Sequence, residues 1–253
     1  MGEARKDALR LESDRRLKLE FHGTNVTSGA GLLAYRELDG ALGLTSTVDS
    51  EFRDTRTSKN TQHSITALLR QSMYSRLAGY DDTNDAERLA LDLAMRHVAG
   101  GRAVERSAAS TSVMSRFETE MLTQPKTLEF LVNLPGMWVD RVNQGKGLNQ
   151  IVLDMDSSVS PTYGSQEGSA YNGHFECTYC HPLFCFNQLA DMERALLRNG
   201  NVHSADEWRC LPEPIVNRYR GYDILRFSRG DAAFADPKMY QYLEAGSTPM
   251  RYN

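Results

Sequence analysis

Hydrophobic residues recur at three- and four-residue intervals through the first half of the chain, which is the spacing of amphipathic helices. Capping residues and glycines mark the ends of these segments. Thr27 or Ser28 can cap the first one, and Gly43 lies where it would stop. The pattern predicts a region built entirely of helices. The expected helices are a segment ending at Gly43, residues 61–77, residues 85–99 capped by Asp85, a segment that begins at Ser112, and residues 126–142, the last interrupted at Leu134-Pro135-Gly136.

The pattern changes after the Gly-Lys-Gly stretch at residues 145–147. Residues 151–156 form a nearly continuous apolar run, broken only by Asp154 and Asp156, which is typical of a central strand buried on both faces. Alternation along a strand puts these two aspartates on the same face. We therefore expect a helical region at residues 1–149, with DNA-end binding as a candidate role, and an α/β domain at residues 150–253.

The rest of the second half reads as strand, strand, helix, strand and helix. Strands are expected at residues 174–180, 183–187 and 222–227. Ser204 and Glu207 have capping-box spacing for a helix to residue 220, with a restart near Glu213 because of two prolines, and Asp236 caps a last helix. A strand that returns beside the first after a helix usually runs parallel to it. That arrangement would bring Asp156 and Asp231 together.

Composition narrows the classes of function. Of 253 residues, 40% are hydrophobic and 25% charged, which predicts a folded chain with a packed core. The net charge of −4 lies entirely in residues 150–253, so any contact with nucleic acid must be local. No apolar run is long enough to span a membrane and the first residues are not a signal peptide, so we expect a cytoplasmic protein whose four cysteines are free thiols.

Asp156 and Asp231 are candidate metal ligands. Carboxylates on rigid strands are the hard oxygen donors that Mg²⁺ prefers, and phosphoryl transfer on nucleic acids commonly uses two such ions about 4 Å apart. Most carboxylates, however, are solvated surface groups or helix caps. The pattern alone leaves both interpretations open.

Longer stretches of the sequence resemble bacterial insertion-sequence transposases of the DDE class. The similarity extends over nearly the whole chain, because short motifs in both halves contribute to it. The matching stretches are LKLEF (17–21), LLRQS (68–72), LAGY (77–80), IVLDMDSS (151–158), YGSQEG (163–168), YNGH (171–174), HPLF (181–184), GNVHSAD (200–206) and RGDAAFA (229–235).

The resemblance implies a partial RNase H-like mixed sheet with flanking helices, preceded by the all-α region. It also implies cleavage of DNA at insertion-sequence ends and strand transfer to target DNA at a Mg²⁺ or Mn²⁺ site. By position, Asp156 and Asp231 are the first two catalytic, metal-binding aspartates. Asp154 is the alternative to Asp156, which is preferred because Ser157 and Ser158 follow it. The implied partner is double-stranded DNA, both inverted repeats and target, with a homodimer allowed, no membrane partner and a bacterial, nucleoid-associated location.

One position departs from the family pattern. A third carboxylate, a glutamate on a later helix, should come well after Asp231, but the sequence ends at Asn253, 22 residues further on. Glu244 is interpreted as ordinary helix surface. We therefore expect the N-terminal portion of a transposase, inactive alone, and the alternative function is a truncated protein that retains only DNA or partner binding. An unrelated RNase H-like nuclease is a weaker alternative.

Other residues suggest different binding sites. Cys177-Thr178-Tyr179-Cys180-His181 matches a c-type haem attachment pattern, which an unexported chain would not use. Zinc binding by this segment with His174 is another alternative, but buried or edge-strand thiols explain the cysteines more simply. The candidates for phosphate contact are Arg96, Arg102, Arg106, Arg116 and His203. The alternative for the arginines is a solvated loop, and the alternative for His203 is a local contact with backbone groups at a helix start.

Overall fold

The computed structural model describes residues 9–10, 13–14, 18–19, 27, 29–52, 54, 56, 62–144, 146–173 and 175–245. The chain forms two compact units, Met1–Leu128 and Glu129–Asn253. The division comes earlier than the expected boundary at residue 149, because most of helix α7 (Pro125–Asn143) belongs to the second unit. Asn133 and Gly136 of α7 lie against strand β8 (Met192–Leu196) of that unit.

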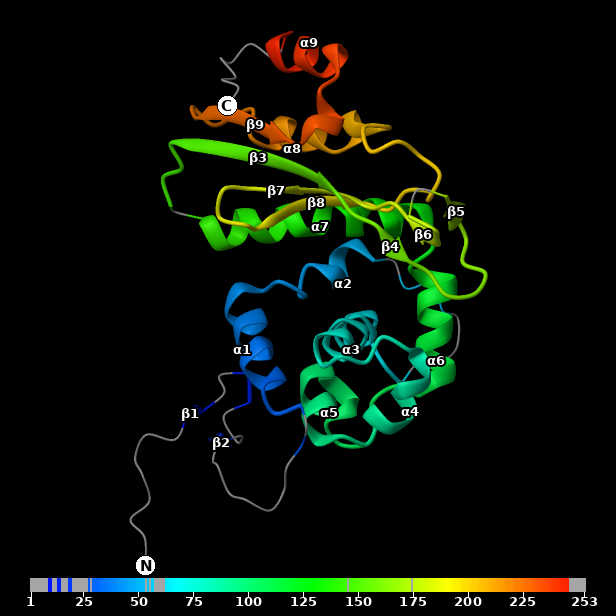
Figure 1. Ribbon diagram of the computed structural model, residues 1–253. Coiled ribbons are helices and arrows are strands. Elements are labelled where there is room, and N and C mark those ends of the chain that lie inside the picture. The colour runs from blue at the N-terminus through cyan, green and yellow to red at the C-terminus, as the bar shows by residue number, and fades with distance from the viewer. Residues whose placement is uncertain are drawn as a thin grey trace, which may run out of the picture. The chain divides into compact units, whose positions relative to one another are not determined.

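The first unit is helical, as expected, apart from one small ladder. Strands β1 (Leu9–Arg10) and β2 (Lys18–Leu19) form an antiparallel pair of two residues each, so the expected all-α description needs this correction. The described helices are α1 (Leu32–Leu42), α2 (Val48–Glu51), α3 (Ile65–Leu77), α4 (Ala86–Leu89), α5 (Leu93–Ala99) and α6 (Thr111–Arg116), which continues into a π-helical turn at Phe117–Met121. Short 3₁₀ turns lie at Thr83–Asp85 and Gly101–Ala103 (Figure 1).

Side-chain caps explain where these helices begin. Ser64 accepts a hydrogen bond from the Ala67 N–H at 3.2 Å, so α3 begins at Ile65, four residues later than expected. The single helix expected at residues 85–99 is wrong, because Asp92 accepts from the Met95 N–H at 2.9 Å and starts a new helix there. The expected stop at Gly43 is confirmed, since this glycine adopts a left-handed conformation with φ of 63°.

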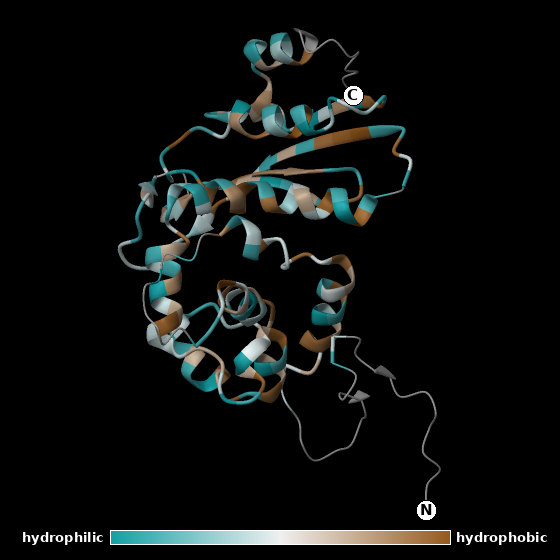
Figure 2. Cartoon of the chain, turned by 180° about the vertical axis from the view of Figure 1, so that it is seen from behind, coloured by the Kyte–Doolittle hydropathy of each residue, from teal (hydrophilic) through white to brown (hydrophobic). Residues whose placement is uncertain are grey.

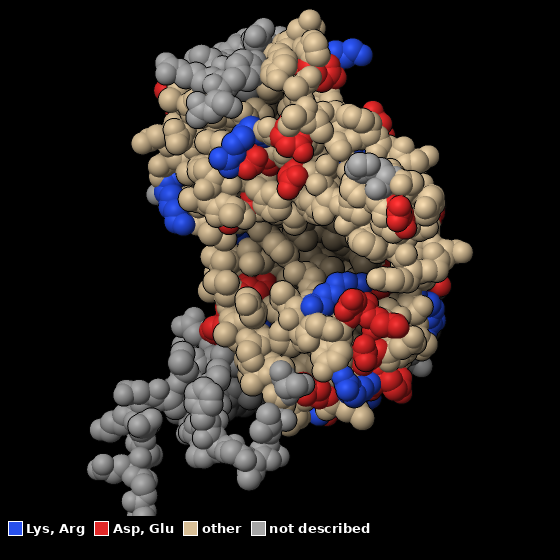
Figure 3. Space-filling model, viewed as in Figure 1, with Lys and Arg blue, Asp and Glu red and all other residues tan. Residues whose placement is uncertain are grey.

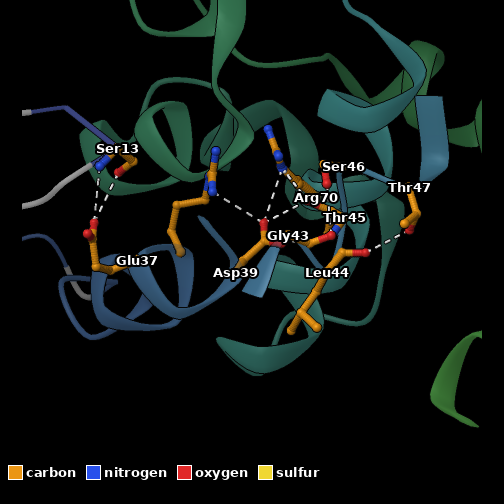
Figure 4. Close-up of polar contacts among 10 residues, drawn as sticks. Ser13, Glu37, Asp39, Gly43, Leu44, Thr45, Ser46, Thr47 and Arg70 are labelled. Atoms are coloured by element: carbon orange, nitrogen blue, oxygen red, sulfur yellow. Dashed lines mark hydrogen bonds and ion pairs between the residues drawn. The ribbon is translucent and has the colours of Figure 1, made fainter. Parts of the chain in front are cut away.

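A buried carboxylate, Asp39, ties α1 to α3 in the first unit (Figure 4). It accepts hydrogen bonds from both the backbone N–H and the hydroxyl of Thr45, each at 2.7 Å. Arg36 and Arg70 approach its Oδ2 at 3.3 Å, and Arg70 Nε also donates to the Thr45 hydroxyl at 2.7 Å. Burial and the negative charge of Asp39 raise the pKa of Tyr74 on α3 to about 12.

The second unit is built on a four-stranded mixed sheet with the order β8-β7-β3-β9 (Figure 1). Strand β9 (Leu225–Gly230) runs parallel to β3 (Gln150–Ser157), whereas β7 (Leu183–Phe186) is antiparallel to β3 and β8 is antiparallel to β7. The strand order and directions are those of an RNase H-like sheet, so the expected fold class is confirmed. The first expected strand and its return partner both lie where the sequence pattern placed them, within a few residues.

The expected meander needs a correction. The segment expected as its second strand forms β6 (Cys177–Cys180), which belongs to a separate sheet with β4 (Ser160–Pro161) and β5 (Ala170–Asn172). The strand that completes the main sheet is β8, which the sequence pattern did not predict because it carries Glu193 and Arg194. His174, the first residue of the expected strand, lies outside the described residues.

Three helices accompany this sheet, and two of them differ from expectation. Helix α7 is continuous through Pro135, so the expected interruption is wrong. The expected capping box at Ser204 is also wrong: a 3₁₀ turn at Trp208–Cys210 precedes helix α8 (Pro212–Arg218), and Pro212 occupies the first helical position. The last helix, α9 (Pro237–Ala245), follows Asp236 as expected. No helix in the described ranges is long and apolar enough to cross a membrane.

The core of the second unit lies on one face of the sheet. Alternate residues of β3, namely Ile151, Leu153 and Met155, are buried against α8 and α9 and the residues that flank them. The apolar stretch of β3 is visible in Figure 2. The intervening positions, which include Asp154 and Asp156, therefore lie on the opposite face of the sheet.

Candidate functional site

Strands β3 and β9 place Asp156 and Asp231 at equivalent positions. The parallel register pairs Asp154 with Arg229 and Met155 with Gly230, a constant offset of 75 residues, and the ladder ends there. Asp156 and Asp231 are the next residues along each chain segment. Neighbouring strands lie about 4.8 Å apart, and residues in register on parallel strands point to the same face. The two aspartates are thus neighbours at the carboxyl ends of adjacent strands.

The two carboxylates are exposed and differ in how they are held. Asp156 lies one residue before the end of β3 and pairs with Phe184 of β7, while its carboxylate makes no hydrogen bond or ion pair with any other residue that the structure describes. Asp231 follows β9 directly, and its Oδ1 accepts a hydrogen bond from the Ala233 N–H at 2.9 Å. This bond orients the Asp231 side chain at the start of a 3₁₀ turn (Ala232–Phe234) and leaves its second oxygen for another ligand.

Asp154, the alternative to Asp156, is engaged elsewhere. Arg229 donates to Asp154 Oδ2 from Nε at 3.1 Å and from Nη2 at 2.6 Å. The hydrogen bond and the negative charge of Asp154 raise the pKa of Arg229. Figure 3 shows acidic side chains gathered beside a basic one on the side of the second unit that is turned toward the viewer. Sequence reasoning missed Arg229, although the shared offset of 75 residues between the two pairs was a signal that could have found it.

The donor set suits a divalent cation, although it is small. Asp156 and Asp231 supply hard oxygen atoms on rigid strand ends that open to solvent, where water and phosphate oxygens can complete the coordination of Mg²⁺ or Mn²⁺. Among the described residues, no group of three or more His, Cys, Asp or Glu side chains is placed to hold a metal. Glu244 lies within α9, but its side chain is outside what the structure describes.

The candidate phosphate-binding arginines are not gathered at the aspartates. Arg96 donates to the carbonyl oxygens of Ala103 and Val104 at 2.8 and 2.7 Å, which holds the turn after α5. Arg116 donates to the Ser112 carbonyl of its own helix at 3.2 Å. Arg102 and Arg106 are exposed. These four residues all belong to the first unit.

His203 has a local role in the second unit. Its Nδ1 accepts from the Ala205 N–H at 3.2 Å, and its backbone N–H donates to Asp206 at 2.7 Å. The exposed imidazole therefore acts in the turn before α8, which agrees with the simpler of the two interpretations of this residue.

Among the described residues, the cysteine-rich segment forms no group of three side chains that could hold a metal ion. Cys177, Cys180, Cys185 and Cys210 are all free thiols, as expected. His181, which could have joined a zinc site, is buried, and its Nδ1 lies 3.1 Å from the Val202 carbonyl oxygen. The remaining candidate ligand, His174, falls outside the described residues.

Comparison with known proteins identifies the family. A family model described as "Transposase DDE domain group 1" matches residues 9–252. A search of curated proteins finds no significant match. Among solved structures, a Mos1 transposase paired-end complex with the left transposon end is 10% identical with a TM-score of 0.27, covering 90% of this chain and 68% of that one. A pre-cleavage Mos1 transpososome is 10% identical with a TM-score of 0.27, covering 91% and 69%. The match of the family model to nearly the full sequence shows that this chain belongs to the transposase DDE domain family, group 1.

Proposed function

We propose that this chain acts in DNA transposition, with Asp156 and Asp231 holding a divalent cation, Mg²⁺ or Mn²⁺, at which DNA is cut at insertion-sequence ends and joined to target DNA. One observation carries the proposal: Asp156 and Asp231 directly follow Met155 and Gly230, the last pair of the parallel ladder between β3 and β9. Residues 75 positions apart in the sequence come to the same edge of the sheet only because β9 returns parallel to β3. The family to which the chain belongs supplies the reaction class.

Each residue of the pair has a distinct task. The cation, when bound, lowers the pKa of a coordinated water and neutralises charge that develops on the phosphate. Asp156, which is free of other partners among the described residues, can give both carboxylate oxygens to it. Asp231 keeps one oxygen on the Ala233 N–H and presents the other. Asp154 is held by Arg229, which supports Asp156 as the first ligand.

Double-stranded DNA is the proposed partner, both as element ends and as target. The exposed Arg102 and Arg106 of the first unit supply local positive charge for phosphate contacts, whereas Arg96 and Arg116 are committed to backbone carbonyls. Pairing of two copies at the two ends of an element is part of the same proposal.

A second candidate function is DNA binding without cleavage. It is motivated by the part of the chain that the structure describes, where no third metal-ligating side chain joins the pair. Under this alternative the protein would occupy element ends, or associate with an active transposase, without cutting DNA.

A nicking assay separates these functions. The full chain is incubated with Mn²⁺ and a supercoiled plasmid that carries the gene with its native flanking DNA, and the nicked form is quantified. Under the first function the chain nicks the plasmid, EDTA abolishes the nicking, and Asp156→Asn or Asp231→Asn lowers it about 100-fold or more, because each removes a metal ligand. The expectation from sequence, a chain inactive alone, corresponds to the second function. Asp223→Asn, a matched change at an exposed aspartate of the same unit, should keep the full rate. Equal nicking by Asp156→Asn and Asp223→Asn would contradict the cation site, and DNA binding with no nicking by the wild type would favour the second function.

A further inference from the structure

Arg229 is placed beside the candidate pair on the same face of the sheet. It precedes Asp231 by two residues on β9 and pairs in register with Asp154, which precedes Asp156 by two residues on β3. Two residues of a strand span about 7 Å. The Arg229–Asp154 pair therefore forms the last cross-strand contact on this face before the two aspartates.

The hydrogen bonds of Arg229 use only one edge of its guanidinium. Nε and Nη2 both donate to Asp154 Oδ2, while Nη1 makes no hydrogen bond with any other described residue. The Arg229 side chain is 60% exposed and that of Asp154 is 35% exposed. A guanidinium held on one edge presents its outer edge, formed by Nη1 and the second hydrogen of Nη2, in a fixed direction.

The charges around Arg229 determine what it can bind. Asp154 contacts the guanidinium directly, and Asp156 and Asp231 each lie two residues further along the chain from this ion pair, so an anion approaching without a cation would meet net negative charge. Cations at Asp156 and Asp231 would reverse this local charge. The free edge of Arg229 matches the geometry of a phosphate, which accepts two parallel hydrogen bonds from arginine.

We propose that Arg229, held in place by Asp154, binds a phosphate of the DNA strand that lies at Asp156 and Asp231. Asp154 is then a positioning residue, and the Asp154–Arg229 pair is a phosphate clamp beside the cutting site. The inference rests on the proposed function for the position of the DNA strand. Because the Arg229 side chain is exposed and that of Asp154 is partly exposed, we do not expect the fold to depend on their ion pair. The inference gives this pair a role in binding DNA instead.

The test measures DNA binding rather than cleavage. Binding of the full chain to a short labelled duplex of the flanking DNA is followed by fluorescence anisotropy, with Ca²⁺ in place of the catalytic cation and, separately, with EDTA. In Ca²⁺ we expect Arg229→Gln to weaken binding about tenfold. The slope of log affinity against log salt should fall by about 0.9, the value for one lost phosphate contact. In EDTA the effect should be much smaller, because the carboxylates then repel the strand.

Two further variants separate geometry from charge. Arg229→Lys keeps the charge, so it should keep the salt slope but lose part of the affinity, because an ammonium cannot present a fixed bidentate edge. Asp154→Ala should weaken binding, because it releases Arg229, whereas an effect of charge alone would strengthen it. Arg220→Gln, at an exposed arginine of the same unit that donates to Asn217 at 2.6 Å, is the matched control and should bind as the wild type does.

The outcomes that overturn the clamp are distinct from failure of the cation site. Wild-type affinity and salt slope in Arg229→Gln, or equal losses in Arg229→Gln and Arg220→Gln, would show that Arg229 does not contact phosphate. Tighter binding by Asp154→Ala would remove the positioning role. If instead Ca²⁺ changes the DNA affinity of Asp156→Asn as much as that of the wild type, the cation site of the proposed function is wrong, regardless of the result for Arg229.

Discussion

At the scale of single residues, the first unit depends on the buried carboxylate of Asp39. Replacing it with asparagine leaves Arg36 and Arg70 without their shared counter-charge and turns one acceptor of the Thr45 bonds into a donor. Breaking a buried ion pair in this way typically costs about 3 kcal/mol or more. We expect Asp39→Asn to lower the free energy of unfolding by about that amount, as measured by urea denaturation.

Glu87→Gln provides the control for Asp39→Asn. It also removes one negative charge from the first unit, but at an exposed position, so its effect should stay within about 0.5 kcal/mol. If the two variants unfolded at the same urea concentration, Asp39 would not be the tie between α1 and α3 that its contacts indicate.

His63, also in the first unit, should make stability sensitive to mild acid. Burial lowers the pKa of His63 below its ordinary value of 6.5, and the positive charges of Arg56 and Arg102 lower it further. The unfolded chain therefore takes up a proton at higher pH than the folded chain does. The contribution of neutral His63 is present above pH 6.5 and is lost as the pH falls through the lower folded-state pKa.

A melting series tests this pH dependence. Between about pH 7.5 and 5.5, the melting temperature of His63→Gln should fall less than that of the wild type, because glutamine cannot take up the proton. His203→Gln, which alters an exposed histidine, should follow the wild-type curve. Identical curves for His63→Gln and the wild type would show that protonation of His63 is not coupled to folding.

At the scale of elements, the fit of α7 in the second unit depends on Gly136. A Cβ there would overlap the Arg218 guanidinium and lie 3.1 Å from the Glu193 carbonyl oxygen. Arg218 cannot easily move aside, because it forms ion pairs with the buried Glu193 and with Asp140. In an exposed helix, glycine to alanine usually stabilises by about 0.5–1 kcal/mol. Gly136→Ala should instead destabilise by about 1–3 kcal/mol because of the overlap.

The same substitution on α1 gives the opposite expectation. At Gly40 the only atom of the described residues near an added Cβ is Arg36 Nη1, at 3.5 Å, which is an ordinary contact. Gly40→Ala should therefore raise the melting temperature while Gly136→Ala lowers it. If the melting temperature rose in both variants, Arg218 would be able to move away from an added Cβ at residue 136 without loss of stability.

Elements defined by local signals could be predicted from the sequence, and those decided by tertiary contacts could not. The apolar run of β3, the stop at Gly43 and the start of α9 each follow from a few adjacent residues. Strand β8 escaped prediction because the charge of Glu193 is buried through hydrogen bonds from Asn187 and Tyr219 and an ion pair with Arg218. Arg218 and Tyr219 are distant from Glu193 in the sequence, and the hydrophobic pattern does not reveal the hydrogen bond from Asn187.

The continuity of α7 shows the same limit of local reasoning. Pro135 removes one helical hydrogen bond, which predicts a break. Packing of this helix buries Leu134, Gly136 and Val139 on either side of the proline, and the helix continues. The capping box at Ser204 failed for the converse reason: the spacing was present, but the helix begins only at Pro212, where proline fits the first turn.

At the scale of the whole molecule, the chemistry proposed for this transposase-family chain depends on one topological fact. The return of β9 parallel to β3 brings together residues 75 positions apart. Sequence order predicted this return, which is observed, and the joint role of Asp156 and Asp231 remains a prediction based on it. It did not reveal that Asp154 is engaged by Arg229, because that ion pair depends on side-chain geometry across the two strands.

The most direct test of the central claim is the binding of Mn²⁺ to the full chain, measured by titration with electron paramagnetic resonance detection of free Mn²⁺. We expect Asp156→Asn and Asp231→Asn each to weaken Mn²⁺ binding at least about tenfold, because each removes a charged ligand. Asp223→Asn should bind as the wild type does. Unchanged Mn²⁺ affinity in both Asp156→Asn and Asp231→Asn would contradict the claim that these two aspartates together form a cation site.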